Sequence, residues 1–309
     1  MPTTPIMRLR SLALLAPAAL LLIAAAPASA RWGDAGHRII GEAAARALPA
    51  EMPAFFRDAE PDLTWLNPEP DRWRDQGEAA LDPALATGLG WDHFVDFEGV
   101  PADAFKAKDR YEFLAALRAV NKDQTVGFLP FRITELTQRI RVDFRLWRAA
   151  TDAAVKRRLE ARIVNDAGIL GHYVGDGANP HHTTIHHNGW VGENPDGYAT
   201  DRRTHYRFEG AFVQSHLTLA DVQPLVGTVA TSVPNIRDAT MAYLRQSHAL
   251  LRPLYDLDKV ERFDSGTVAT THQQFVAHRL AAGAAMLRDL WWTAWVTSGQ
   301  PTPQRAPRE

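Results

Sequence analysis

The chain has 309 residues, 12 histidines and no cysteine, with 34 Lys and Arg against 36 Asp and Glu, for a net charge of −2. The lack of cysteine excludes disulfides, thiolate zinc sites, iron–sulfur clusters and a cysteine nucleophile. With 46% hydrophobic and 23% charged residues, the composition is that of a globular protein rather than a disordered or fibrous one. No block of five or six like charges occurs, which argues against nucleic-acid binding through a basic face.

Residues 1–30 have the three parts of a secretory signal peptide. Arg8 and Arg10 precede an apolar run over 11–26, and the A-S-A sequence at 28–30 matches a cleavage site. The apolar run is shorter than the ~20 residues that a membrane-spanning helix needs. We therefore predict an exported protein, periplasmic or secreted, whose net charge changes from −2 to −4 because the peptide carries two arginines and no acidic residue.

The remaining chain has mostly helical periodicity, with apolar residues three and four positions apart. Residues 92–97 form the one short β-like run, which could also begin a helix. The stretches 61–90 and 188–204 are rich in Pro, Gly, Asp and Asn and predict long loops, and residues 298–309 predict a disordered tail. We expect one all-α domain over 31–297, with no internal repeat. The predicted helices cover 37–48, 111–120, 133–149, 153–174, 209–219, 226–251 and 268–296.

Six of the twelve histidines lie between residues 172 and 205. Imidazole is a common ligand of zinc and other divalent metals, so this cluster predicts a metal site. His172 and His205 each have a carboxylate four residues later, Asp176 and Glu209, and on a helix that spacing places both side chains on one face. His182 follows the predicted end of the first of these helices, and a turn there would bring it back beside Asp176. The other histidines of the cluster, without an assigned role, are His181, His186 and His187.

The segment 172–182, H-Y-V-G-D-G-A-N-P-H-H, resembles the central motif of the zinc-dependent phospholipase C and S1/P1 nuclease superfamily. Three other segments resemble further motifs of that superfamily in the family's order. They are W-G-D-A-G-H at 32–37, H-F-V-D at 93–96, and His205-x-x-x-Glu209. The resemblance covers more than half of the chain after the signal peptide, and it is closer to the S1/P1 nucleases.

The resemblance implies a helical protein of the phospholipase C/P1 nuclease type that binds three zinc ions at the bottom of a cleft. An aspartate ligand is expected upstream of His93, and Asp71 matches it better than its neighbours Asp62 and Asp75. Asp71 and Asp176 are also the predicted catalytic residues. The implied ligands are Asp71, His93, His172 and Asp176 for one ion; Asp176, His37 and the amine and carbonyl of Trp32 for its bridged neighbour; and His182, His205 and Glu209 for the third.

These residue types fit the chemistry of phosphate esters. Nitrogen and carboxylate ligands suit zinc, and a hydroxide held between two zinc ions can attack phosphorus while a third ion stabilises charge on the oxygens. Zinc also supplies the positive charge that this acidic protein needs to bind phosphate. By the same resemblance, Phe94 would stack on a base and Asp96 would hydrogen-bond to it. If Arg31 stays after cleavage, Trp32 has no terminal amine to offer as a ligand.

We predict a monomeric, secreted zinc-dependent phosphodiesterase that hydrolyses single-stranded nucleic acid or nucleotides, with DNA, RNA and 3′-nucleotides as open alternatives. The short spacing from Trp32 to His37 and the wide spacing from His182 to His205 favour this function. Glu209 and the lack of cysteine favour the alternative, a phospholipase C. A zinc-binding protein without catalysis is the alternative of another class. The histidines predicted to be structural are His216, His248, His272 and His278.

Overall fold

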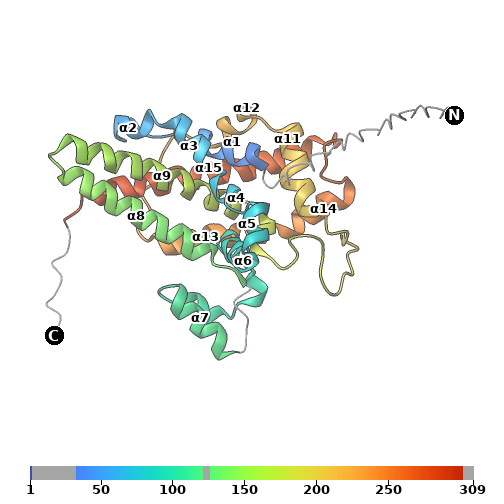
Figure 1. Cartoon of the computed structure of the whole chain (residues 1–309). Helices are drawn as coiled ribbons and strands as arrows, with labels where there is room; N and C mark the ends of the chain where they lie inside the picture. Colours follow the sequence, from blue (N-terminus) through green and yellow to red (C-terminus); the bar gives the residue numbers. More distant parts are fainter. Residues whose placement is uncertain (2–32, 121–125, 302–309) are drawn as a thin grey trace.

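Three long helices form the centre of the protein: α8 (Leu129–Ala149), α9 (Ala153–Ala178) and α15 (Thr270–Ser298). They pack side by side and are drawn next to one another in Figure 1. The structure, a computed structural model, describes residues 1, 33–120 and 126–301. Residues 2–30 of the predicted signal peptide, Arg31, Trp32 and most of the predicted tail lie outside these residues.

Two of the long helices, α8 and α9, begin at residues that favour a helix start. Asp152 accepts hydrogen bonds from the backbone N–H groups of Ala154 and Val155 and so caps α9, and a proline stands in the first turn of α8. The three helices meet in one apolar core, in which the fully buried Trp291 of α15 donates its indole N–H to the carbonyl of Ala167 in α9. The predicted all-α class and single domain are confirmed for the described residues.

Shorter helices surround this centre, and α1 (Gly33–Arg46) packs against α3, α9 and α15. In Figure 1, α7 projects from the rest of the molecule, and its buried Phe113 and Leu117 belong to a separate small apolar cluster. The other α-helices are α2 (Ala54–Arg57), α3 (Glu60–Leu66), α4 (Glu69–Arg72), α5 (Gln76–Leu81), α6 (Pro83–Gly90), α7 (Arg110–Ala119), α10 (Thr204–Tyr206), α11 (Val213–His216), α12 (Leu219–Val222), α13 (Ile236–Ala249) and α14 (Leu251–Val260).

The prediction of a long loop over 61–90 is wrong, because this stretch contains most of α3 and all of α4, α5 and α6. Its Pro and Asp residues start helices rather than interrupt them. Pro61 and Pro70 stand in the first turns of α3 and α4, and Asp75 caps α5 by accepting from the N–H groups of two following residues. The predicted loop over 188–204 is irregular as far as residue 203.

Two other predicted elements differ in detail. The run 92–97 forms no strand: two 3₁₀ turns, η1 (Trp91–His93) and η2 (Phe97–Gly99), flank an extended segment whose Val95 N–H donates to the carbonyl of His182 at 2.9 Å. The helix predicted from residue 226 begins only at Ile236, because the Asn235 side chain caps it there. None of the helices in the part of the chain that the structure describes is long and apolar enough to cross a membrane.

Candidate metal centre

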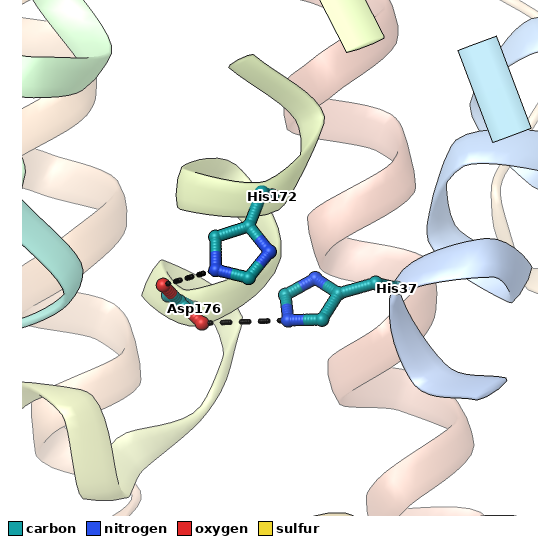
Figure 2. Close-up of side chains that lie close together, drawn as sticks. All are labelled: His37, His172 and Asp176. Atoms are coloured by element: carbon teal, nitrogen blue, oxygen red, sulfur yellow. Dashed lines mark ion pairs between the residues drawn. The ribbon is translucent and has the colours of Figure 1, made fainter. Parts of the chain in front are cut away.

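The candidate metal centre is built around the C-terminal half of α9, where every residue from 166 to 178 is buried. His172 and Asp176 lie one turn apart on this helix, and α1 brings His37 against them, as Figure 2 shows. The rings of His37 and His172 stack with their centroids 3.9 Å apart. Gly175 makes this approach possible, because a Cβ atom there would lie 2.8 Å from Nδ1 of His37.

The two carboxylate oxygens of Asp176 face different histidines. Oδ2 is 3.0 Å from Nδ1 of His93 and 3.3 Å from Nε2 of His172. Oδ1 is 3.5 Å from Nε2 of His37 and 3.7 Å from Nε2 of His182. Two ligand atoms that bind one tetrahedral zinc ion at ~2.0–2.1 Å are about 3.3 Å apart. The separations around Asp176 therefore fit a carboxylate shared between two ions.

Three groups of side chains could each hold a metal ion, since the ligand atoms within each group lie within 4.8 Å of one another. His172 belongs to two of them, so two of the sites would be adjacent. The groups contain all eight predicted ligands that the structure describes; the ninth, Trp32, lies outside the described residues. We call them the Asp176 group (His37, His172 and Asp176), the Asp71 group (Asp71, His93 and His172) and the Glu209 group (His182, His205 and Glu209).

The structure distinguishes Asp71 from the two neighbouring aspartates that the sequence offered as alternatives. Asp71, in α4, lies beside His93 and His172. The carboxylate of Asp75 instead accepts hydrogen bonds at the N-terminus of α5, and Asp62 is exposed on α3. Of the three, Asp71 is the one whose carboxylate reaches the metal centre.

The three residues of the Glu209 group lie in a 3₁₀ turn, a short α-helix and a π-helix. His182 lies in the 3₁₀ turn η5 (Pro180–Thr183), His205 lies in α10, and Glu209 lies in the π-helix η6 (Arg207–Phe212). Oε2 of Glu209 is 2.9 Å from Nε2 of His205 and 3.3 Å from Nε2 of His182, and the two Nε2 atoms are 3.1 Å apart. All three separations are close to those of ligands on one tetrahedral ion. Single π-helical turns occur frequently at functional sites.

Backbone carbonyls hold two of the histidines in the form that binds a metal. Nδ1 of His172 lies 3.0 Å from the carbonyl of Asn67, and Nδ1 of His182 lies 2.7 Å from the carbonyl of His93. Each imidazole donates its Nδ1–H to that carbonyl, which leaves the lone pair of Nε2 directed into the site.

Several ring nitrogens at the centre have no hydrogen-bond partner although they are buried. They are both nitrogens of His37 and Nε2 of His93. A buried polar atom without a partner is costly and uncommon. A zinc ion between His37 and Asp176 would satisfy Nε2 of His37, the ring nitrogen that faces Oδ1 of Asp176, so the donor set fits zinc in its chemistry as well as in its spacing.

The pKa shifts of these side chains also favour metal binding. Burial lowers the pKa of His37 and His93 well below the usual value and lowers the pKa of His172 to about 4, so these rings are neutral near pH 7, as metal ligands must be. Burial raises the pKa of Asp176 well above its usual value. Burial acts in the same direction on Glu209, but His205 and His182 outweigh it and hold its pKa well below the usual range. Asp176 is thus a buried carboxylate whose ionised form needs added positive charge.

Phe94 and Asp96 lie on the extended segment that follows His93, and both are half-buried. The backbone of this segment is held beside the Glu209 group by the hydrogen bond from Val95 to His182. Burial, followed by the charge of Glu98, raises the pKa of Asp96 to about 7. The two predicted substrate contacts therefore adjoin the candidate metal ligands.

The sequence prediction missed Arg74, whose guanidinium lies 3.6 Å from the carboxylate of Asp71. Burial is the main cause of the low pKa of His93, and the charge of Arg74 adds to it, so this cation acts on the candidate metal ligands. The three-residue spacing from Asp71 to Arg74 is a signal that could have revealed it. Asn67 was also missed, because it contributes a backbone carbonyl, and no sequence pattern marks such a contact.

The remaining histidines of the cluster belong to none of the three groups. His181 is buried with both ring nitrogens unpartnered, and its ring centroid lies 5.3 Å from that of His205. His186 stacks on Trp190 at 4.0 Å, and His187 is exposed. Among the histidines predicted to be structural, ring nitrogens hydrogen-bond to backbone carbonyls in His216, His248 and His272.

Replacing Gly171 by alanine is expected to destabilise the metal-free protein by about 1–3 kcal/mol, the usual cost of overpacking a core. A Cβ atom at Gly171 would lie 2.0 Å from the side-chain nitrogen of Asn67, whose backbone carbonyl orients His172. Urea unfolding measures this change. Gly266→Ala is the matched control, because a Cβ atom there meets nothing within 4 Å. Equal stability of the two variants would contradict the packing argument.

Fold and site together define an all-helical, single-domain protein with three residue groups that could bind metal ions. Comparison of the chain with protein-family models, with curated proteins and with solved structures gave no match.

Proposed function

We propose that this protein is an exported zinc-dependent phosphodiesterase that hydrolyses single-stranded nucleic acid or nucleotides. The observation that carries the proposal is the carboxylate of Asp176, whose two oxygens face different histidines at the junction of adjacent ligand groups. Sites with two metal ions in such proximity are typical of phosphatases and nucleases. The motifs that resemble those of the S1/P1 nucleases supply the same ligands, and this agreement supports the proposal.

Zinc ions bound in these groups would supply positive charge for the phosphate oxygens and would lower the pKa of water for attack on phosphorus. The chain itself contributes Arg74, a cation beside Asp71 that can bind a phosphate oxygen. Phe94 offers a ring for stacking on a base, and Asp96 offers a carboxyl group for hydrogen bonding to the edge of that base. Since the chain carries a net charge of −2, phosphate binding would depend on this local positive charge.

A zinc-dependent phospholipase C is the second candidate, favoured by Glu209 at the position where the fungal nucleases carry aspartate. A zinc-binding protein without catalysis is a weaker proposal. Storage of an ion does not need a carboxylate directed toward two neighbouring ligand groups.

The proposal is tested by assaying the purified, zinc-loaded protein against single-stranded DNA, RNA, 3′-nucleotides and vesicles of phosphatidylcholine. We expect turnover of nucleic acid or nucleotides, its loss on addition of a chelator, and its return with zinc. Turnover of the lipid alone would replace the nuclease by the phospholipase. Metal analysis that finds less than one zinc per chain would reject both.

A further inference from the structure

Asn179 lies between α9 and the turn η5, at a point that joins two of the ligand groups. Its backbone N–H donates to the carbonyl of Asp176, and its own carbonyl accepts from the N–H of His182, both at 3.0 Å. Its side chain is fully buried. The residue thus connects a ligand of the Asp176 group with a ligand of the Glu209 group.

The side-chain amide of Asn179 can satisfy its neighbours in only one orientation. Oδ1 accepts the N–H of His181 at 3.0 Å, and Nδ2 donates to Oε2 of Glu209 at 3.2 Å. If the amide were rotated by half a turn, its oxygen would face a carboxylate oxygen and its NH₂ would face an N–H group. The contact with His181 therefore fixes the amide so that it presents a donor to Glu209.

The oxygen that receives this hydrogen bond is the one that faces the metal ligands. Oε2 of Glu209 lies 2.9 Å from Nε2 of His205 and 3.3 Å from Nε2 of His182. A glutamate side chain has several rotatable bonds, and a fixed donor at Oε2 favours the conformation in which the carboxylate completes the group.

We propose that Asn179 is a positioning residue that orients the Glu209 carboxylate for binding of an ion by the Glu209 group. The inference rests on the proposed metal centre, and it adds a residue that contributes no ligand atom. Hydrogen-bond partners of metal ligands change metal affinity by about 10–100-fold when they are removed.

The test is the variant Asn179→Ser in the full-length protein. A serine hydroxyl can still accept the N–H of His181, as serine does at helix starts, but it is too short to donate to Glu209. Zinc binding is measured by titration in competition with a chelator, and by the zinc content that remains after dialysis. We expect one ion to bind about 10–100-fold more weakly than in the wild type. The affinity of the other ions should not change.

Asn235→Ser is the matched control. Asn235 caps α13 through Oδ1 and donates through Nδ2 to a carboxylate oxygen of Asp238 at 2.7 Å, an exposed copy of the same arrangement without metal ligands. This variant should bind zinc like the wild type. Circular dichroism establishes that each variant is folded, and Asn179→Asp, which keeps the side-chain volume and the cap but loses the donor, replaces the serine variant if that does not fold.

Wild-type affinity for every ion in the folded Asn179 variant would overturn the inference and leave the proposed function intact. Equal weakening of all ions would also overturn it, because the hydrogen bond that the Asn179 side chain makes to a candidate ligand goes to Glu209. Wild-type protein that binds no zinc would reject the proposed function itself.

Discussion

His172→Ala is expected to abolish binding at two of the three ligand groups and to reduce phosphodiester hydrolysis by about a thousandfold. His172 belongs to both the Asp176 group and the Asp71 group. Loss of the charge stabilisation that metal ions supply is worth several kcal/mol, which corresponds to a factor of about a thousand in rate. Zinc analysis and the hydrolysis assay measure the two effects.

The control for this variant is His216→Ala, which removes an imidazole that hydrogen-bonds to the carbonyl of Asp264, away from the ligand groups. It should keep the zinc content and the activity of the wild type. Unchanged zinc content in folded His172→Ala protein would show that His172 is not a ligand.

Asp176→Asn is expected to have opposite effects on the metal-free and the zinc-loaded protein. Without metal, burial raises the pKa of Asp176 well above its usual value, so at pH 7 the ionised carboxylate is unfavourable in the folded state. A neutral side chain of the same shape removes this cost, and we expect a gain of about 1–3 kcal/mol in the free energy of unfolding of the metal-free protein. With zinc present, the variant should lose both the ions and the stability that they add.

The pH dependence gives this prediction a second readout. A carboxyl group whose pKa is raised by folding costs stability above its unfolded pKa, which is about 3.9 for aspartate. This cost diminishes as the pH falls through the folded pKa toward that value. Asp176→Asn should therefore stabilise the metal-free protein less at pH 5 than at pH 7. Denaturant unfolding at both pH values, with and without zinc, provides the measurement, and a variant less stable than the wild type without metal would contradict the argument.

Much of the architecture follows from local patterns in the sequence. The apolar spacing over 133–149 and 153–174 predicted α8 and α9 to within a few residues, since helical periodicity depends on neighbouring residues alone. The same reasoning failed over 61–90. Proline and aspartate occur both in loops and in the first turn of a helix, and only packing against α1 and α9 selects the helical form of α3.

For the candidate ligands, too, contacts within one helical stretch could be predicted from the sequence, whereas contacts between distant segments could not. His172 with Asp176, and His205 with Glu209, were predicted from a four-residue spacing, and in the structure each pair lies within 3.3 Å. By contrast, the 3.0 Å approach of His93 to Asp176 joins residues 83 positions apart. Spacing within one helix cannot predict that distance.

Composition and short-range spacing were enough to predict the helical class and the residue types that could bind metal, because both are local properties of the chain. The grouping of those residues depends on tertiary packing. The fold places the carbonyl of Asn67 on His172, Nδ1 of His93 beside Asp176, and the amide of Asn179 on Glu209. These contacts join residues at least 30 positions apart in the chain, and they depend on how the segments around α9 pack against it.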